Sequence, residues 1–375
     1  MSSSAGALRR VVAAVAMVSV SALATAACAN FSEQSRSERA GTFTTVPPQQ
    51  GPGDPPTQQP RDDDSEAGPP PTGPCVDPNP GVIATCLETT SGVRPAAADG
   101  LSTYVAERTT GKIFVSKRYG PQRLIATVPV DGAGDGGLID FEMSPTYQED
   151  QLIYALISTD SDNRVVRIAP GDSVKPILTG IPKGATGNMG SISFASPTEL
   201  RVATGDAGSG QGLAGKLFTI DPNVDDPTPK IIASGLGSNV ALCPDAENGR
   251  LYVADHSSSG DRLQQVESGG LRKLWSWSDT PGVTGCAVAG GLISVSFAKA
   301  FRIDTLAAPT NASPSVGQPS TADVKKDFGA VARMTSTGDG LQIATVNKSV
   351  PGAPSETFND RVAIYLPQGG SDDLS

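Results

Sequence analysis

The chain has 375 residues and a formal net charge of −10 at pH 7, with 18% charged and 38% hydrophobic residues. An acidic balance of this size argues against a nucleic-acid partner, because phosphate backbones are bound by clustered Lys and Arg side chains. The length alone would allow two domains, but an internal repeat favours a single one.

The first 27 residues have the layout of a secretory signal peptide. Arg9 and Arg10 precede an apolar run over 11–23, and small residues at 25–27 come directly before Cys28. This order resembles a bacterial lipobox, although a Thr stands where Leu is usual. The resemblance implies cleavage before Cys28 and acylation of that residue, which would hold the protein on a membrane. A simple secreted protein and an uncleaved anchor are the alternatives.

Residues 28–74 are rich in Pro, Gly, Gln, Ser and Thr and contain few large apolar side chains. Such a segment cannot offset the entropy lost on ordering, so we predict a disordered tether after the acylated Cys28. The acidic run 62–64 is interpreted as solvation rather than as a metal site. Residues 369–375 are expected to be a disordered tail. The domain would therefore lie outside the cytoplasm, on the cell membrane within the envelope.

One short phrase recurs six times between Leu101 and Leu366. Each copy has a β-branched or aromatic run, a polar turn and a second such run, which is a strand signature. The six pairs of runs are 102–106 with 112–115, 151–156 with 163–168, 200–204 with 215–220, 251–254 with 261–266, 291–295 with 300–303, and 341–346 with 360–365. A single copy cannot bury its own apolar face, so the copies are expected to pack on one another.

Further apolar runs surround most of these copies. One precedes the copy, as at 138–143 and 191–194, and another often follows, as at 175–178 and 230–233. Four strands and about 45 residues per unit are typical of propeller blades. We therefore predict an all-β, six-bladed β-propeller over residues 75–368, with almost no helix. An irregular sandwich is the alternative, but it would not require the same phrase six times.

Four Cys remain after Cys28, and an exported chain with four Cys favours two disulfides. Three connectivities are possible. We favour Cys75–Cys86, which closes a short loop where the chain enters the domain. Cys243 and Cys286 lie on matching strands of neighbouring repeats, so they could bridge two blades. Buried free thiols are the alternative, and no CxxC spacing indicates a zinc cluster.

Few other residues suggest chemistry. The one His of the chain is His256, so a hydrolase triad or a His-based zinc site would have to use it alone. The Gly-rich run 132–137 is not followed by Lys and Ser or Thr, and we interpret it as a turn between blades rather than as a phosphate loop. Trp275 and Trp277 alternate on one strand, which favours core packing over an exposed sugar platform.

Several phrases resemble the soluble quinoprotein glucose/sorbosone dehydrogenases. They are 136–138, 144–147 and 152–154, followed by 204–208 and 213–217. The resemblance covers most of residues 93–366, and the anchor, tether and propeller together resemble a mycobacterial envelope lipoprotein. The family implies a six-bladed propeller that holds pyrroloquinoline quinone (PQQ) over its central channel, with Ca²⁺ beside it and a His as general base. PQQ and Ca²⁺ are implied here by the resemblance only.

The resemblance fails at the positions that carry the family's chemistry. Matching the strands puts Gly187 where the family has its catalytic His, and a glycine cannot accept a proton. The family's Arg-Asn pair falls on Ser238 and Asn239, so its cation is missing. The acidic-His-Gly phrase falls on 255–257, where only the acid and the His remain. The candidate cofactor-binding residues are therefore Asn188, Asp206, Asn239 and Asp255, and the candidate catalytic residue is His256.

Two function classes follow from this pattern. The first is a monomeric binding module of the cell envelope that takes a small-molecule or protein ligand and has lost dehydrogenase chemistry. The second is a PQQ-dependent aldose or sorbosone dehydrogenase with an altered general base. The missing His and Arg favour the first class.

Overall fold

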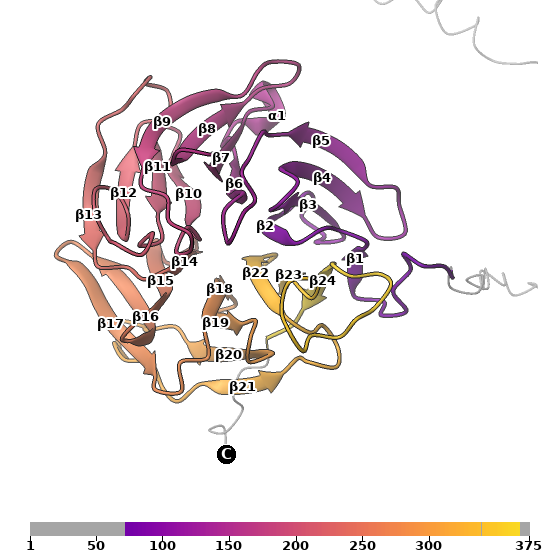
Figure 1. The fold of residues 1–375 in the computed structure, drawn as a ribbon. Helices are drawn as coiled ribbons and strands as arrows, with labels where there is room; N and C mark the ends of the chain where they lie inside the picture. Colours follow the sequence, from indigo (N-terminus) through magenta and orange to yellow (C-terminus); the bar gives the residue numbers. More distant parts are fainter. Residues whose placement is uncertain (1–71, 339, 368–375) are drawn as a thin grey trace, which may run out of the picture. The chain divides into compact units, whose positions relative to one another are not determined.

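The structure is a computed structural model, which describes residues 72–338 and 340–367. These residues form six four-stranded antiparallel sheets and one short helix. Figure 1 shows the sheets arranged radially around a central axis, so the predicted six-bladed β-propeller is confirmed. The predicted signal peptide, Cys28, most of the tether and the C-terminal tail lie outside the described residues.

Each of the first five blades runs in chain order from its innermost to its outermost strand. Blade 1 contains β2 (Thr90–Pro95), β3 (Ser102–Glu107), β4 (Lys112–Lys117) and β5 (Arg123–Thr127). Blade 2 contains β6 (Leu138–Met143), β7 (Ile153–Ser158), β8 (Asn163–Ile168) and β9 (Lys175–Ile181). Blade 3 contains β10 (Ser191–Ser196), β11 (Glu199–Ala203), β12 (Lys216–Ile220) and β13 (Lys230–Ser234). Blade 4 contains β14 (Asn239–Asp245), β15 (Arg250–Ser257), β16 (Gly260–Glu267) and β17 (Gly270–Trp277). Blade 5 contains β18 (Val283–Ala289), β19 (Leu292–Phe297), β20 (Arg302–Ala307) and β21 (Ser320–Asp323).

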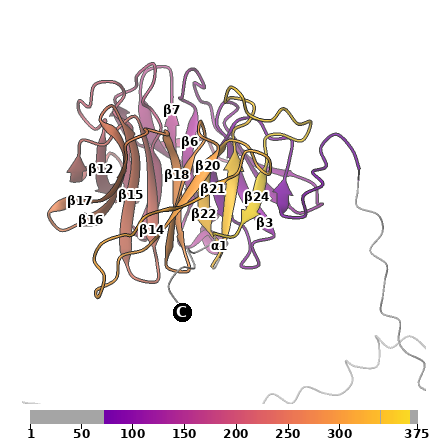
Figure 2. The same ribbon diagram turned by 90° about the horizontal axis from the view of Figure 1, so that it is seen from below.

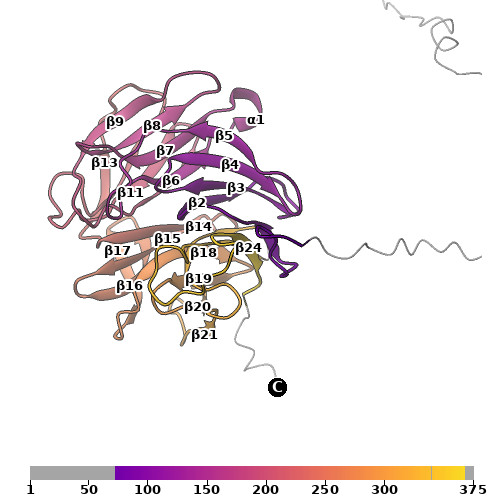
Figure 3. The same cartoon turned by 45° about the vertical axis from the view of Figure 1, so that its right-hand side comes forward.

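Blade 6 is built from both ends of the domain. Its inner strands are β22 (Val331–Ser336), β23 (Leu341–Thr345) and β24 (Val362–Tyr365), and its outermost strand is β1 (Val82–Ala84). In Figures 1 and 3 the indigo N-terminal segment lies beside this yellow blade. All three residues of β1 are buried. The ring is therefore closed by pairing the first strand with the last.

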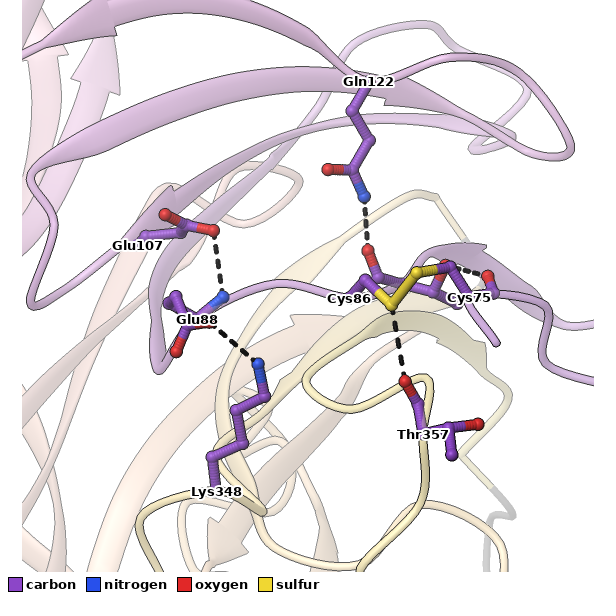
Figure 4. Close-up of a disulfide and its surroundings, with 8 residues drawn as sticks. Cys75, Cys86, Glu88, Glu107, Gln122, Lys348 and Thr357 are labelled. Carbon is purple, nitrogen blue, oxygen red and sulfur yellow. Dashed lines mark hydrogen bonds and ion pairs between the residues drawn. A yellow bond between two sulfur atoms is a disulfide. The ribbon is translucent and has the colours of Figure 1, made fainter. Parts of the chain in front are cut away.

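The disulfide Cys75–Cys86 brackets this closing strand, with a Cα–Cα distance of 5.5 Å. Figure 4 shows its surroundings. The Glu88 amide donates to Glu107 Oε1 at 2.9 Å, and Lys348 Nζ lies 3.0 Å from Glu88 Oε1. The predicted pairing is confirmed, and the segment after the disulfide contacts both blade 1 and blade 6.

The second disulfide, Cys243–Cys286, joins the inner strands β14 and β18 of neighbouring blades, which confirms the predicted bridge. It lies in an apolar cluster with Trp277, which is 5% exposed. The Trp277 indole Nε1 donates to Asp304 Oδ2 at 2.7 Å, and Trp275 packs against the same cluster from a partly buried position. Core packing, rather than a sugar platform, is the observed role of this pair.

The helix α1 (Tyr147–Asp150) is a single turn, in line with the prediction of almost no helix. It follows the Ser144-Pro145 turn, and the Asp150 carboxylate accepts hydrogen bonds from the hydroxyls of Ser144 and Thr146. No helix within the described ranges is long and apolar enough to cross a membrane.

Candidate functional site

The strands of each blade run between two faces of the propeller, as the side view in Figure 2 shows. We call the face on which the innermost strands begin the upper face, and the opposite one the lower face. Because the strands are antiparallel, the turn between the second and third strands of a blade also lies on the upper face. The residues selected from the sequence therefore gather on the upper face of blades 3 and 4.

Backbone hydrogen bonds hold these loops together. The amide of Ala207 donates to Gly187 O at 2.8 Å, the amide of Asp206 donates to Gly237 O at 3.0 Å, and the amide of Ser238 donates to His256 O at 2.7 Å. The structure thus brings together segments that are up to 69 residues apart (187 to 256) in the sequence. The loops on the upper face of blades 3 and 4 therefore lie in direct contact through their backbones.

Gly187 adopts a backbone conformation that residues with a side chain rarely take. Its φ is +81°, in the left-handed region, and a Cβ there would lie 2.5 Å from Asp206 Oδ1 and 3.0 Å from the amide nitrogen of Ala207. Its own amide donates to Asp135 Oδ2 at 2.7 Å. The backbone and the Asp206 carboxylate therefore fill the space that a base at this position would need.

Asn188 is 2% exposed, and its amide group is used within the protein. Its Nδ2 donates to Asp135 Oδ1 at 2.6 Å and to Gly184 O at 2.9 Å, while its Oδ1 accepts from Asn163 Nδ2 at 3.1 Å and from the Gly184 amide at 3.0 Å. Asp135 comes from the Gly-rich run 132–137, which lies between β5 and β6 as the predicted turn between blades. Sequence reasoning missed that this turn supplies the carboxylate that holds the Gly187 loop.

Asp255 is fully buried and also engaged. Its carboxylate accepts from the Gly237 amide at 2.8 Å, from Gln264 Nε2 at 3.1 Å and from Arg262 Nε at 3.1 Å. The Arg262 guanidinium forms an ion pair with Asp255. These contacts link β15 to β16 and to the loop before β14, so the carboxylate of Asp255 has a structural role.

Asp206 and Asn239 are half-buried. Asp206 Oδ1 accepts from the Gly208 amide at 3.0 Å. Asn239 faces His256 across the β14–β15 pairing, and its Oδ1 is buried without a hydrogen-bond partner. These two residues retain more free hydrogen-bonding capacity than Asn188 or Asp255.

His256 has the geometry of a proton acceptor. Its Nδ1 lies 2.6 Å from Asp261 Oδ1, and its side chain is 35% exposed while Asp261 is fully buried. The hydrogen bond to Asp261 raises the pKa of His256, while partial burial and the charge of Lys299 oppose this increase. Asp261 is itself fixed by the Gly282 amide, which donates to its Oδ2 at 2.6 Å. With Nδ1 held by a carboxylate, Nε2 is the nitrogen available to take a proton.

The pairing of His256 with Asp261 was not predicted. The two residues are directly opposite in the β15–β16 hairpin. Counting back across the turn between two predicted strands would have found the pair, because opposite residues of an antiparallel hairpin have adjacent side chains.

No group of His, Cys, Asp and Glu with the arrangement of a metal site occurs in the described part of the chain. The upper face of blades 3 and 4 can therefore offer one half-buried imidazole with its buried carboxylate, together with partly free amide and carboxylate groups.

Comparison with solved structures finds propellers of the same architecture. The PQQ-bound aldose sugar dehydrogenase from Streptomyces coelicolor is 23% identical, with a TM-score of 0.66 over 76% of this chain and 95% of that one. A putative glucose dehydrogenase from Thermus thermophilus is 20% identical, with a TM-score of 0.64 over 76% and 98%. The apo form of the soluble aldose sugar dehydrogenase from Escherichia coli is 14% identical, with a TM-score of 0.60 over 76% and 99%.

The chain shares its fold with sugar dehydrogenase propellers. At these identities the likeness concerns the fold, and the chemistry has to be argued from the residues present. No protein-family model and no curated protein sequence matches the chain.

Proposed function

We propose that this protein is a membrane-anchored lipoprotein of the cell envelope whose propeller binds a ligand and does not oxidise sugars. The observation that carries the proposal is the closed loop at Gly187, where a Cβ would lie 2.5 Å from Asp206 Oδ1. The lipobox-like order of residues before Cys28 supports the anchor.

The residues at the quinone positions do not fit the cofactor of the structural neighbours. The carboxylates of PQQ require cationic or hydrogen-bonding partners. Ser238 is neutral where the family has Arg, and Asn188 and Asp255 are already engaged within the protein. Asp206 adds a negative charge to the same face.

A second candidate function is a dehydrogenase with a relocated base, and it is favoured by the His256–Asp261 pair. In that case Nε2 of His256 would accept the proton of a substrate hydroxyl, and Asp261 would orient the ring and stabilise its charged form. The 2.6 Å contact and the 35% exposure of the ring are compatible with this role.

Dye reduction distinguishes the two functions. The full-length protein is mixed with PQQ, Ca²⁺ and a panel of aldoses, beside His256→Ala and the control Ser258→Ala, which changes an exposed residue of the same turn. We expect no turnover above that of a protein-free blank. Turnover that survives in Ser258→Ala and falls about 10²- to 10⁴-fold in His256→Ala would replace our proposal with the dehydrogenase function.

A further inference from the structure

A cavity of about 250 Å³ occupies the central channel. The innermost strands of all six blades line it, and these strands surround the axis in Figure 1. Its lining extends to residues near the ends of those strands, where Pro244 is exposed and Ser336 half-buried, so it opens toward the lower face. Drug-sized sites occupy roughly 300–1,000 Å³, so any occupant of this cavity is small.

One side of the cavity carries a saturated ion-pair cluster. Arg94 Nε lies 2.9 Å from Glu142 Oε2, and Arg94 Nη2 lies 3.2 Å from Asp140 Oδ1. Asp140 also accepts from Ser191 Oγ at 2.8 Å and from the Ile192 amide at 3.0 Å. Asp140 and Glu142 are therefore committed to partners of their own and do not neutralise another cation by direct contact.

Arg333 is the second cation of the cavity, and it lacks such a partner. It reaches from β22 across the channel, where Nη1 donates to Val240 O at 3.0 Å and Nη2 donates to Gly190 O at 2.7 Å. The residue is 5% exposed, and its Nε has no hydrogen-bond partner. Within 72–338 and 340–367, no carboxylate forms an ion pair with it.

Burying the Arg333 guanidinium without a carboxylate partner is energetically unfavourable unless a ligand supplies the negative charge. A guanidinium stays charged in proteins, and a buried charge is strongly unfavourable without a counter-charge. Burial lowers the pKa of Arg333, and the carboxylate of Asp140 only partly offsets this. Ser193, which also lines the cavity, is 5% exposed, and its buried hydroxyl likewise has no hydrogen-bond partner. Arg333 and Ser193 thus both line the cavity, and each has one buried polar atom, Nε and Oγ respectively, without a hydrogen-bond partner.

The opposite wall is apolar. Leu242 from β14, Ala287 and Val288 from β18 and Met334 from β22 line it. An occupant that satisfies both walls has an anionic group for Arg333 and an apolar body for this surface.

We propose that the channel binds a small organic monocarboxylate, whose carboxylate pairs with Arg333 and accepts a hydrogen bond from Ser193, while its apolar body packs against the wall formed by Leu242, Ala287, Val288 and Met334. This deepens the proposed binding function and rests on it, because it names the ligand class and the place. The Arg333 side chain crosses the channel between this cavity and the upper face, so the site is separate from His256.

Calorimetry of the full-length protein tests the proposal with sodium benzoate and sodium hexanoate as probes. Benzamide and inorganic phosphate serve as a neutral ligand of the same shape and an anion without an apolar body. We expect benzoate and hexanoate to bind, with benzamide and phosphate at least about tenfold weaker. Loss of the charged contact in Arg333→Met should weaken benzoate binding roughly 10- to 100-fold, whereas the control Arg272→Met, on the outermost strand β17, should leave it unchanged.

Four results would overturn the proposal: no binding of either carboxylate, equal binding of benzamide, equal binding of phosphate, or unchanged affinity in a folded Arg333→Met protein. If that variant does not fold, NMR of the parent protein replaces the affinity measurement. The Nε–H resonance of Arg333 is assigned by its loss in Arg333→Lys. A shift of this resonance on adding benzoate supports the site, and an unmoved resonance contradicts it. Calorimetry tests the channel site, and dye reduction tests whether the protein oxidises sugars. A negative result in calorimetry does not change the outcome of dye reduction, so the two proposals can be refuted independently.

Discussion

At the scale of single residues, the upper face contains two kinds of polar side chain. Some are fully hydrogen-bonded within the protein, and one, the imidazole of His256, keeps a nitrogen available. Asn188 and Asp255 have their polar atoms filled by neighbours, whereas the imidazole of His256 is partly exposed and held at one nitrogen. The sequence could point to His256, because it is the one His in the chain. The sequence could not show that the Asp135 carboxylate accepts a hydrogen bond from the Gly187 amide, because that contact joins segments 52 residues apart.

The ionisation of His256 is directly measurable because no other imidazole contributes signals. The hydrogen bond to Asp261 raises the pKa of His256 above its ordinary value of 6.5, so the folded protein binds this proton more tightly than the unfolded chain does. The stabilising contribution is complete below pH 6.5 and is lost as the pH rises through the folded-state pKa. NMR titration of the ring should show a higher pKa than in Asp261→Asn. Equal pKa values in the two proteins would contradict the role assigned to Asp261.

Asp135 is predicted to hold the Gly187 loop closed. Asp135→Ala leaves the Gly187 amide and the Asn188 side chain without their acceptor, and a buried donor without a partner costs about 1–3 kcal/mol. Urea denaturation should show this loss in the free energy of unfolding, while the exposed control Asp172→Ala should stay within about 0.5 kcal/mol of the parent. Equal stability of the two variants would mean that the turn does not hold the loop.

At the scale of strands, the repeat predicted the middle strands of every blade, because these alternate β-branched residues between polar turns. It did not predict β1, which has three residues, or β21 (Ser320–Asp323), which is polar and largely exposed. Such strands are defined by pairing with a neighbouring strand rather than by their own pattern. The contacts of Arg94 and Arg333 with other blades were missed for the same reason, since they join residues as many as 143 positions apart.

The closing strand offers a matched test of this pairing. Ile83 on β1 is 4% exposed, whereas Ile231 on β13, another outermost strand, is 45% exposed. Ile83→Ala should cost about 2–5 kcal/mol of unfolding free energy, as expected for a buried aliphatic side chain. Ile231→Ala should cost well under about 1 kcal/mol. A similar small loss in both variants, measured by chemical denaturation, would show that β1 is not needed to close the ring.

At the scale of the whole molecule, the proposed arrangement is a propeller attached to a membrane through Cys28. Two or more acyl chains give durable membrane binding, and a net charge of −10 gives the chain no overall attraction to anionic lipids. Cys28→Ala should therefore move the protein from the membrane fraction to the soluble fraction after fractionation of the producing cells. The control Cys75→Ser keeps Cys28 and should remain with the membranes. Retention of Cys28→Ala on the membrane would refute the lipid anchor.

The propeller shares its fold with sugar dehydrogenases, and we propose that it has no site for the quinone. Equilibrium dialysis of PQQ against the full-length protein in the presence of Ca²⁺ tests this claim most directly, because it requires no knowledge of a substrate. We expect no saturable binding on the upper face, so PQQ should reach equal concentrations on both sides of the dialysis membrane, apart from any weak component that is lost in Arg333→Met. Saturable binding at one PQQ per protein, unchanged in Arg333→Met and abolished in His256→Ala, would contradict it.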